Sequence, residues 1–406
     1  MKRVLFVMLL FAAMLATLFV SCQRSDEEEE PALEIDPDAT LVIWADEQRA
    51  PILEELGGQF TETYGVPVTV QQLGFGDIRD NLKVAGPAGE GPDILVGAHD
   101  WLGELVASGL VAPLDLGARQ ADFSDSSIQA FTYEGELYGM PYAVENVAFV
   151  YNPDLVADVP ADFNEVLEIS RELQASGDAQ YGFVRQEGDP YHFFPIQTSF
   201  GGYVFDVNPD GTYNPDRVGI DDEGSIEAAE WLEEGVTSEL IPAGLDYDGY
   251  HLLFEEGDAA MIITGPWAIG RLNESGVSYE VAPIPGDGAP FLGVQGFMVS
   301  AFTEYQAIAT AFLTEFVATT DVQYAIYEAD GRAPAHVEAL GMVEDETVAA
   351  FGAAGVAGLP MPAIPEMSAV WTAWGDAVTL IMQEQVGGSE AFSTAAEQIR
   401  ATIAGE

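Results

Sequence analysis

The segment that most constrains the fold of this 406-residue chain is residues 139–154, a largely apolar stretch with the carboxylate of Glu145 near its centre. Val147, Phe149 and Tyr151 place β-forming side chains on one face of a predicted strand, and the residues between them are also apolar. A strand with two apolar faces is typical of the interior of an α/β sheet. The carboxylate of Glu145 does not fit such an interior unless it has partners, because burying an unpaired charge is costly. Glu145 is therefore either hydrogen-bonded within the fold or faces a wet cleft.

Strand and helix patterns alternate from residue 40 onward. Residues 40–44 and 66–70 are apolar strand patterns, and between them residues 52–64 carry apolar side chains every three or four positions, up to Gly65. This β-α-β unit predicts a parallel sheet with a right-handed crossover, the helix ending at the glycine. Asp162 or Asn164 is expected to cap a later helix. The same patterns predict strands at 91–97, 259–263, 279–285 and 296–299, the last two returning the chain toward its first half, and helices at 163–173, 225–234, 306–318 and within 367–403.

The charge balance is strongly acidic, with 13 Lys and Arg against 68 Asp and Glu and a formal net charge of −55. Such a chain is a poor partner for nucleic acid, which proteins bind through cationic side chains. Because the acidic residues are spread along the chain, we interpret them as a solvated surface. A cation-binding acidic protein is the alternative.

The start of the chain has the layout of a secretory signal. A basic start, Met1-Lys2-Arg3, precedes the apolar run 4–20, and Ser21 stands directly before Cys22, the only cysteine. This resembles a bacterial lipoprotein processing site, so residues 1–21 are expected to be a signal peptide and Cys22 to be lipidated. An uncleaved membrane anchor is the alternative. Residues 22–38 are acidic with little to bury, which predicts a disordered tether to a body outside the cytoplasm, periplasmic or at the cell surface.

From about residue 40 to the end, the chain resembles the bacterial extracellular solute-binding proteins of ABC importers, and among them the maltose and maltodextrin-binding proteins. The resemblance implies a two-lobe α/β fold, in which each lobe is a sheet flanked by helices and sugar binds in the cleft between them. Its boundaries imply a first lobe at 39–146, a second lobe at 147–295, and a return at 296–406 whose C-terminal helices pack on both lobes. The resemblance rests on these segments in order: Leu41-Val42-Ile43-Trp44, Gly91-Pro92-Asp93-Ile94, Ala98-His99-Asp100, Ala143-Val144-Glu145, Tyr151-Asn152, Gly201-Gly202-Tyr203, Gly265-Pro266-Trp267-Ala268 and Pro365-Glu366-Met367-Ser368-Ala369.

The resemblance also implies candidate ligand contacts. Asp100 and Glu145 match sugar-hydroxyl acceptors, and Arg49 matches a basic donor after the first strand. Asp189-Pro190-Tyr191 matches a Glu-Pro-Tyr motif of the family, whose acid and tyrosine contact sugar. The remaining candidates are tryptophans, of which Trp267 and Trp371 match the stacking pair of the second lobe and Trp101 and Trp374 lie beside matched segments.

Four positions depart from the best-known pattern. Gln48 stands in place of an aspartate, Gly97 in place of a tryptophan, and both Trp101 and Gly375 in place of arginines. Trp101 and Trp374 could restore the lost contacts, but the sugar subsites have been rebuilt.

The residue types themselves suit a neutral sugar. Carboxylates accept hydrogen bonds from hydroxyl pairs, and the apolar face of a pyranose packs on an aromatic ring. The four histidines, at positions 99, 192, 251 and 336, are far apart and lack metal-ligand spacing, so no metal or cofactor is expected.

We therefore expect a monomeric, lipid-anchored binding protein, not an enzyme, that captures maltose or maltodextrin and delivers it to an ABC permease. Another di- or oligosaccharide such as trehalose or a cellobiose-type sugar is the alternative ligand. A secreted glycosidase that uses Glu145 and Asp189 is the competing class, because two carboxylates at the right separation can cleave a glycosidic bond.

Overall fold

The computed structural model describes residues 39–209 and 212–405. The predicted signal peptide at 1–21, the predicted lipidation at Cys22 and the predicted tether at 22–38 lie outside the described residues. Among the described residues, no helix has the length and apolar character needed to cross a membrane.

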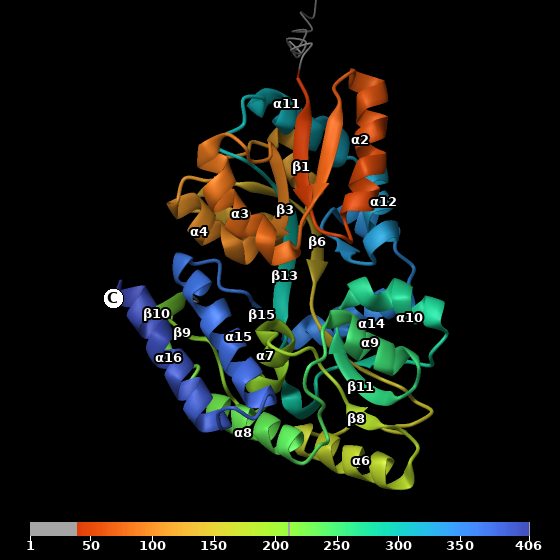
Figure 1. Cartoon of the computed structure of the whole chain (residues 1–406). Helices are drawn as coiled ribbons and strands as arrows, with labels where there is room; N and C mark the ends of the chain where they lie inside the picture. The colour runs from red at the N-terminus through yellow and green to blue at the C-terminus, as the bar shows by residue number, and fades with distance from the viewer. Residues whose placement is uncertain (1–38, 210–211, 406) are drawn as a thin grey trace, which may run out of the picture. The chain divides into compact units, whose positions relative to one another are not determined.

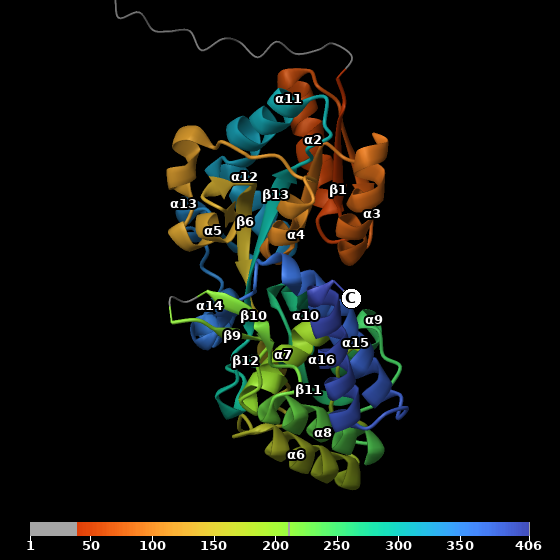
Figure 2. The ribbon, with the colours of Figure 1, turned by 90° about the vertical axis from the view of Figure 1, so that its left-hand side faces the viewer.

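The larger sheet of the described chain has seven strands in the order β14-β6-β13-β3-β1-β2, with β15 paired to β13 (Figure 1). These strands are β1 (Leu41–Ala45), β2 (Val68–Gln72), β3 (Ile94–Ala98), β6 (Gly139–Glu145), β13 (Phe291–Val299), β14 (Ala333–Pro334) and β15 (Leu359–Pro360). β1 pairs in parallel with β2 and β3, which confirms the predicted β-α-β unit. β13 runs antiparallel to β3 and β6, and β6 and β13 lie side by side in both views (Figures 1 and 2).

We call this sheet and the helices packed around it the first lobe. Its helices are α2 (Ala50–Tyr64), α3 (Phe75–Ala88), η1 (His99–Trp101), α4 (Leu102–Ala107), η2 (Gly117–Asp122), α5 (Asp125–Ala130), α11 (Gln306–Ala311), the π-helical turn η5 (Phe312–Val317), α12 (Thr320–Asp330) and α13 (Val337–Leu340), and a short hairpin pairs β4 (Thr132–Tyr133) with β5 (Glu136–Leu137). α2 buries Leu53, Leu56 and Phe60, as its spacing predicts, and ends at Gly65, whose φ of +76° is a left-handed cap.

The smaller sheet has the order β12-β7-β11-β8, and with its helices it forms the second lobe. Its strands are β7 (Ala148–Tyr151), β8 (Tyr181–Phe183), β11 (Ala259–Thr264) and β12 (Glu280–Ala282). A separate two-stranded ladder pairs β9 (Phe205–Val207) with β10 (Tyr213–Val218), which contacts α16. Its helices are α6 (Phe163–Ser176), α7 (Pro190–Ser199), α8 (Glu223–Thr237), α9 (Tyr247–Glu255), η3 (Pro266–Ala268), α10 (Ile269–Ser275), η4 (Pro285–Asp287), α14 (Glu346–Ala354), η6 (Gly355–Ala357), α15 (Ser368–Met382) and α16 (Gly388–Ala404). Asp162 caps α6 by accepting from the backbone N–H groups of Asn164 and Glu165.

The apolar segment 139–154 forms two strands rather than one, and they lie in different sheets. β6 ends at Glu145 in the larger sheet, and β7 begins at Ala148 in the smaller one. The side chain of Asn146 donates hydrogen bonds to the carbonyls of Val147 (3.2 Å) and Phe351 (2.9 Å), which fixes the backbone between the two strands. Glu145 therefore lies at a crossing between the lobes.

The predicted strand at 279–285 does not return the chain to its first half. Its paired part, β12, stays in the smaller sheet beside β7, where the hydroxyl of Tyr151 donates to Glu280 at 2.6 Å. The return is made by β13, which begins at Phe291. α15 and α16 pack on α8 of the second lobe, while η7 (Pro365–Met367), just before α15, contacts α4 and η1 of the first.

Candidate functional site

A cavity of about 480 Å³ is lined by residues of both lobes. This volume lies within the roughly 300–1,000 Å³ range of small-molecule sites. The cavity brings together eight of the nine candidate contact residues: Arg49, Asp100, Trp101, Glu145, Asp189, Tyr191, Trp267 and Trp371. Trp374 does not line it.

Asp100 is held at the end of β3, in the η1 turn. It is 6% exposed, and its Oδ2 accepts a hydrogen bond of 3.0 Å from the indole Nε1 of Trp371, on α15. Burial raises the pKa of Asp100 to about 6, because removal from water penalises the charged form. The bond therefore joins a first-lobe carboxylate to a second-lobe aromatic at the cavity wall.

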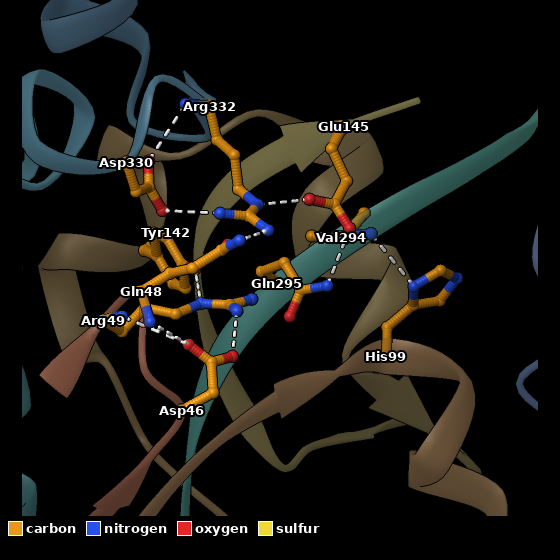
Figure 3. Close-up of polar contacts among 10 residues, drawn as sticks. All are labelled: Asp46, Gln48, Arg49, His99, Tyr142, Glu145, Val294, Gln295, Asp330 and Arg332. Carbon is orange, nitrogen blue, oxygen red and sulfur yellow. Dashed lines mark hydrogen bonds and ion pairs between the residues drawn. The ribbon is translucent and has the colours of Figure 1, made fainter. Parts of the chain in front are cut away.

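Glu145 is buried and both its oxygens have partners (Figure 3). Oε1 accepts from Gln295 Nε2 at 2.8 Å, and Oε2 accepts from Arg332 Nε in a buried ion pair. Burial opposes its ionisation, but the charges of Arg332 and Arg49 outweigh burial, so the pKa of Glu145 is lowered. Asp330 also pairs with Arg332.

Arg49 follows β1, as expected, but its guanidinium is largely engaged inside the first lobe. Nε donates to the hydroxyl of Tyr142 at 2.6 Å, and Nη1 forms a buried ion pair with Asp46. Figure 3 shows this pair beside the Arg332 group. Nη2 is buried and has no hydrogen-bond partner among the described residues.

Asp189 caps the start of α7. Its Oδ1 accepts from the backbone N–H of Tyr191 (2.8 Å) and His192 (3.3 Å), and its Oδ2 contacts His192 Nδ1. Burial alone would raise the pKa of Asp189, but His192 and Arg185 lower it to about 2. The hydroxyl of Tyr191 is buried without a hydrogen-bond partner among the described residues, and burial raises its pKa well above the usual value.

The tryptophans differ in their access to the cavity. Trp267 and Trp371 are half-buried, and the guanidinium carbon of Arg332 lies 4.9 Å from the ring centre of Trp267. Trp374 is fully buried: it stacks behind Trp371, with ring centres 6.1 Å apart, and meets Phe194 edge-on. We therefore leave Trp374 out of the proposed ligand contacts, since it supports Trp371 from the core.

Two of the four positions that depart from the family pattern, Gly97 and Trp101, are matched to each other in the structure. A Cβ atom on Gly97 would lie 2.4 Å from Cζ3 of Trp101, so the glycine makes room for this ring. A Cβ on Gly375 would lie 2.9 Å from the carbonyl oxygen of Gly188, at a close approach of α15 to the loop before α7. Gln48 accepts from Arg332 Nη2 at 3.2 Å.

The four histidines have separate local roles. His99 accepts from the backbone N–H of Val294, and burial lowers its pKa to about 4. His192 contacts Asp189, His251 lies between Tyr247 and Thr264, and His336 caps α13. In the part of the chain that the structure describes, no three His, Cys, Asp or Glu side chains are grouped to hold a metal ion.

Sequence reasoning missed two residues at the centre of the site, Arg332 and Gln295. Both line the cavity and both contact Glu145. Gln295 is a lone polar residue in the apolar strand 291–299, the same signal that singled out Glu145. Arg332 could have been noted because basic residues are so scarce in this chain.

Comparisons with known proteins agree with this architecture. Residues 55–353 match the family described as bacterial extracellular solute-binding protein. The galactooligosaccharide-binding protein of Bacillus subtilis (strain 168) is 29% identical, covering 89% of both chains. The maltotriose-binding protein of Pyrococcus abyssi (strain GE5 / Orsay) is 31% identical, covering 76% of this chain and 69% of its own. The maltooligosaccharide ABC transporter solute-binding lipoprotein of Streptococcus pneumoniae serotype 4 (strain ATCC BAA-334 / TIGR4) is 27% identical, covering 95% of this chain and 93% of its own.

The expected two-lobe α/β fold, in which each lobe is a sheet flanked by helices, is confirmed. With the match covering most of its length, the chain belongs to the bacterial extracellular solute-binding proteins.

Proposed function

We propose that this protein captures a maltodextrin-type oligosaccharide outside the cytoplasm and delivers it to an ABC permease. The observation that carries the proposal is the cavity itself, where the buried carboxylate of Asp100 lies beside aromatic rings from both lobes. Carboxylates accept sugar hydroxyls and aromatic rings pack on the apolar faces of pyranoses. Relatives named for maltotriose and maltooligosaccharides support this sugar class.

In this proposal Asp100 accepts hydrogen bonds from sugar hydroxyls, and Trp267 and Trp371 stack on sugar rings. Trp101 and Tyr191 complete the walls. Arg49 and Asp189 hold the walls in place, because most of their polar atoms are already bonded within the fold. Binding is proposed to proceed without turnover.

Capture works through closure of the two lobes. A sugar that contacts both lobes binds the closed form more tightly than the open form, so it shifts the equilibrium between them. The closed form then docks on the permease. The expected boundaries, 39–146 for the first lobe and 147–295 for the second, are proposed with one change: β13 already returns the chain to the larger sheet from Phe291. The C-terminal helices after this return are proposed to pack on the second lobe and to contact the first through η7 and Trp371.

Anchoring is a separate part of the proposal. Residues 1–21 act as a signal peptide, Cys22 carries lipid, and residues 22–38 tether a monomeric body to the membrane. The pneumococcal relative is named as a lipoprotein, which supports this arrangement. Metabolic labelling with a radioactive fatty acid tests it, and a Cys22→Ser variant that is labelled as strongly as the unaltered protein would contradict it.

The relative named for galactooligosaccharides gives a specific reason to consider a galactose-containing ligand. Trehalose and cellobiose-type sugars are further alternatives.

A thermal-shift panel decides among these ligands. It compares maltose, maltotriose, longer maltodextrins, a galactooligosaccharide, trehalose, cellobiose and xylobiose. A ligand at 100 times its Kd adds about 2.7 kcal/mol to the unfolding free energy, so the true ligand raises Tm clearly. A rise with malto-oligosaccharides alone is expected, and no response to any of them would overturn the proposal. Chromatography after prolonged incubation with maltotriose checks for cleavage, which would favour the glycosidase.

A further inference from the structure

Glu145 has both carboxylate oxygens engaged inside the protein. Gln295 donates to Oε1 and Arg332 donates to Oε2, and all three side chains are at most 5% exposed. These bonds use one acceptor position on each oxygen and anchor the Glu145 carboxylate within the protein, whether or not a sugar is bound.

The bond to Glu145 fixes the orientation of the Gln295 amide. An ionised carboxylate only accepts hydrogen bonds, so the amide nitrogen must face it and the amide oxygen must face away. Figure 3 shows this oxygen on the side away from Glu145. Gln295 is 3% exposed and lines the cavity, and its Oε1 has no hydrogen-bond partner among the described residues. A buried acceptor without a donor is unfavourable unless a ligand supplies one.

Arg332 has spare donors at the same place. Its Nε, Nη1 and Nη2 each make one hydrogen bond within the described residues, to Glu145, Asp330 and Gln48. A guanidinium carries five N–H groups, which leaves two for a ligand. Arg332 also lines the cavity.

We propose that Gln295 contacts the sugar through its amide oxygen, with Arg332 as a neighbouring donor, and that Glu145 is a positioning residue that orients both. An acceptor and a donor side by side suit two adjacent hydroxyls of one pyranose. The inference rests on the proposed function, and it replaces the direct contact of Glu145 that the family resemblance implies.

The chain supplies a matched control. Gln323 is also a buried glutamine, at 1% exposure, with an amide oxygen that has no hydrogen-bond partner in the described chain. It lies on α12, and its Nε2 donates to the carbonyl of Val317 at 3.0 Å. It does not line the cavity. A Gln→Met substitution removes the amide at either position and keeps the length of the side chain.

The first test is calorimetric titration with maltotriose. Gln295→Met is expected to weaken binding about tenfold, the scale of one buried hydrogen bond. Gln323→Met is expected to bind as the unaltered protein does. Unchanged affinity of Gln295→Met, while the unaltered protein binds maltotriose, would overturn the inference and leave the proposed function standing. Failure of the unaltered protein to bind any oligosaccharide would instead overturn the proposed function.

The second test separates contact from positioning with monodeoxy maltotriose analogues. The hydroxyl that meets Gln295 is the one whose removal weakens binding to the unaltered protein but not to Gln295→Met. Glu145→Gln should bind more weakly overall yet remain sensitive to removal of that hydroxyl, with Glu145→Asp used if Glu145→Gln does not fold. If sensitivity disappears in Glu145→Gln and persists in Gln295→Met, Glu145 is the contact and the proposal is wrong.

Discussion

Asp100 and Trp371 are joined by a 3.0 Å hydrogen bond between residues of different lobes, from the indole nitrogen to the carboxylate. Asp100 follows β3 of the first lobe, and Trp371 lies on α15, which packs on second-lobe helices. The bond fixes the plane of the ring against which a sugar would stack. A ligand that binds the Asp100 carboxylate would therefore act on the hydrogen bond between Asp100 and Trp371, which connects the two lobes.

Burial of Asp100 makes the stability of the protein depend on pH. Its folded pKa of about 6 lies above the usual 3.8, so the native state holds this proton more tightly than the unfolded chain. Ionisation then costs stability as pH rises from about 4 to about 6, by about 3 kcal/mol at most at about 1.4 kcal/mol per pKa unit. Asp100→Asn should be more stable than the unaltered protein at pH 7, and the gain should vanish below pH 4. Urea unfolding at both pH values checks this, and equal stability at pH 7 would contradict it.

The pKa of Asp189 is shifted in the opposite direction to that of Asp100, so its effect on stability has the opposite pH dependence. Its pKa is lowered to about 2, with burial outweighed by His192 and Arg185. Its ionised form therefore stabilises the fold above about pH 4, and that stability is lost as pH falls toward 2. Asp189→Asn should be less stable than the unaltered protein at neutral pH, by about 2 kcal/mol. The same unfolding experiment should show this deficit shrink in acid, and a deficit that stays constant with pH would count against the charge of Asp189.

Trp267→Ala should weaken sugar binding about 30-fold or more, the scale of an aromatic hot spot. Trp267 is half-buried at the cavity, and the guanidinium of Arg332 packs on its ring, so truncation removes a surface that is already held in place. The control is Trp44→Phe. Trp44 is 4% exposed in β1, donates to Gln71, and does not line the cavity, so its replacement should leave affinity unchanged. Calorimetric titration of both variants measures the difference, and equal affinities would exclude stacking on Trp267.

Arg332→Met should destabilise the protein by about 3–5 kcal/mol, because it leaves the buried carboxylates of Glu145 and Asp330 without their cation. The deficit should be largest at neutral pH. In the unaltered protein burial raises the pKa of Glu145, but the charges of Arg332 and Arg49 lower it further than burial raises it. Without Arg332 that pKa rises, so protonation of Glu145 in acid removes the cost of burying an unpaired carboxylate. Arg171→Met removes an exposed pair with Glu234 and should cost about 1 kcal/mol or less. Thermal melts from pH 4 to 7 would refute this account if the two variants behaved alike.

Much of the fold could be predicted from local patterns, because helix and strand periodicity are local. The helix predicted at 52–64 forms at 50–64, and its presence, the parallel pairing of its flanking strands and the cap at Asp162 all follow from neighbouring residues. The sequence could not show where the chain changes sheets. Residues 139–154 have the pattern of one largely apolar strand, yet the chain breaks after Glu145. Bonds from the Asn146 side chain to Val147 and to Phe351, a residue far away in sequence, fix this break.

In the candidate site too, the sequence predicts residues in recognisable local segments but not contacts between distant residues. Residue types and the family resemblance were enough to predict Asp100, Trp267 and Trp371, which line the cavity, because each lies in a recognisable segment. The sequence could not show that Arg332 forms a buried ion pair with Glu145, because the two residues are 187 positions apart. Trp374 does not line the cavity, because it lies about one turn further along α15, stacks behind Trp371 and is fully buried in the core.

Two adjacent glycines in α2 give a test of the packing that depends on no ligand. A Cβ on Gly58 meets nothing within 4 Å, whereas a Cβ on Gly57 would lie 2.9 Å from Cβ and Cγ1 of Val68 on β2. Gly58→Ala should stabilise the protein by about 0.5–1 kcal/mol, since alanine loses less backbone entropy in a helix. Gly57→Ala should instead destabilise it by about 1–3 kcal/mol, because helix and strand must separate. Urea unfolding of both variants measures the difference, and stabilisation by both would show that α2 does not pack on β2 as closely as described.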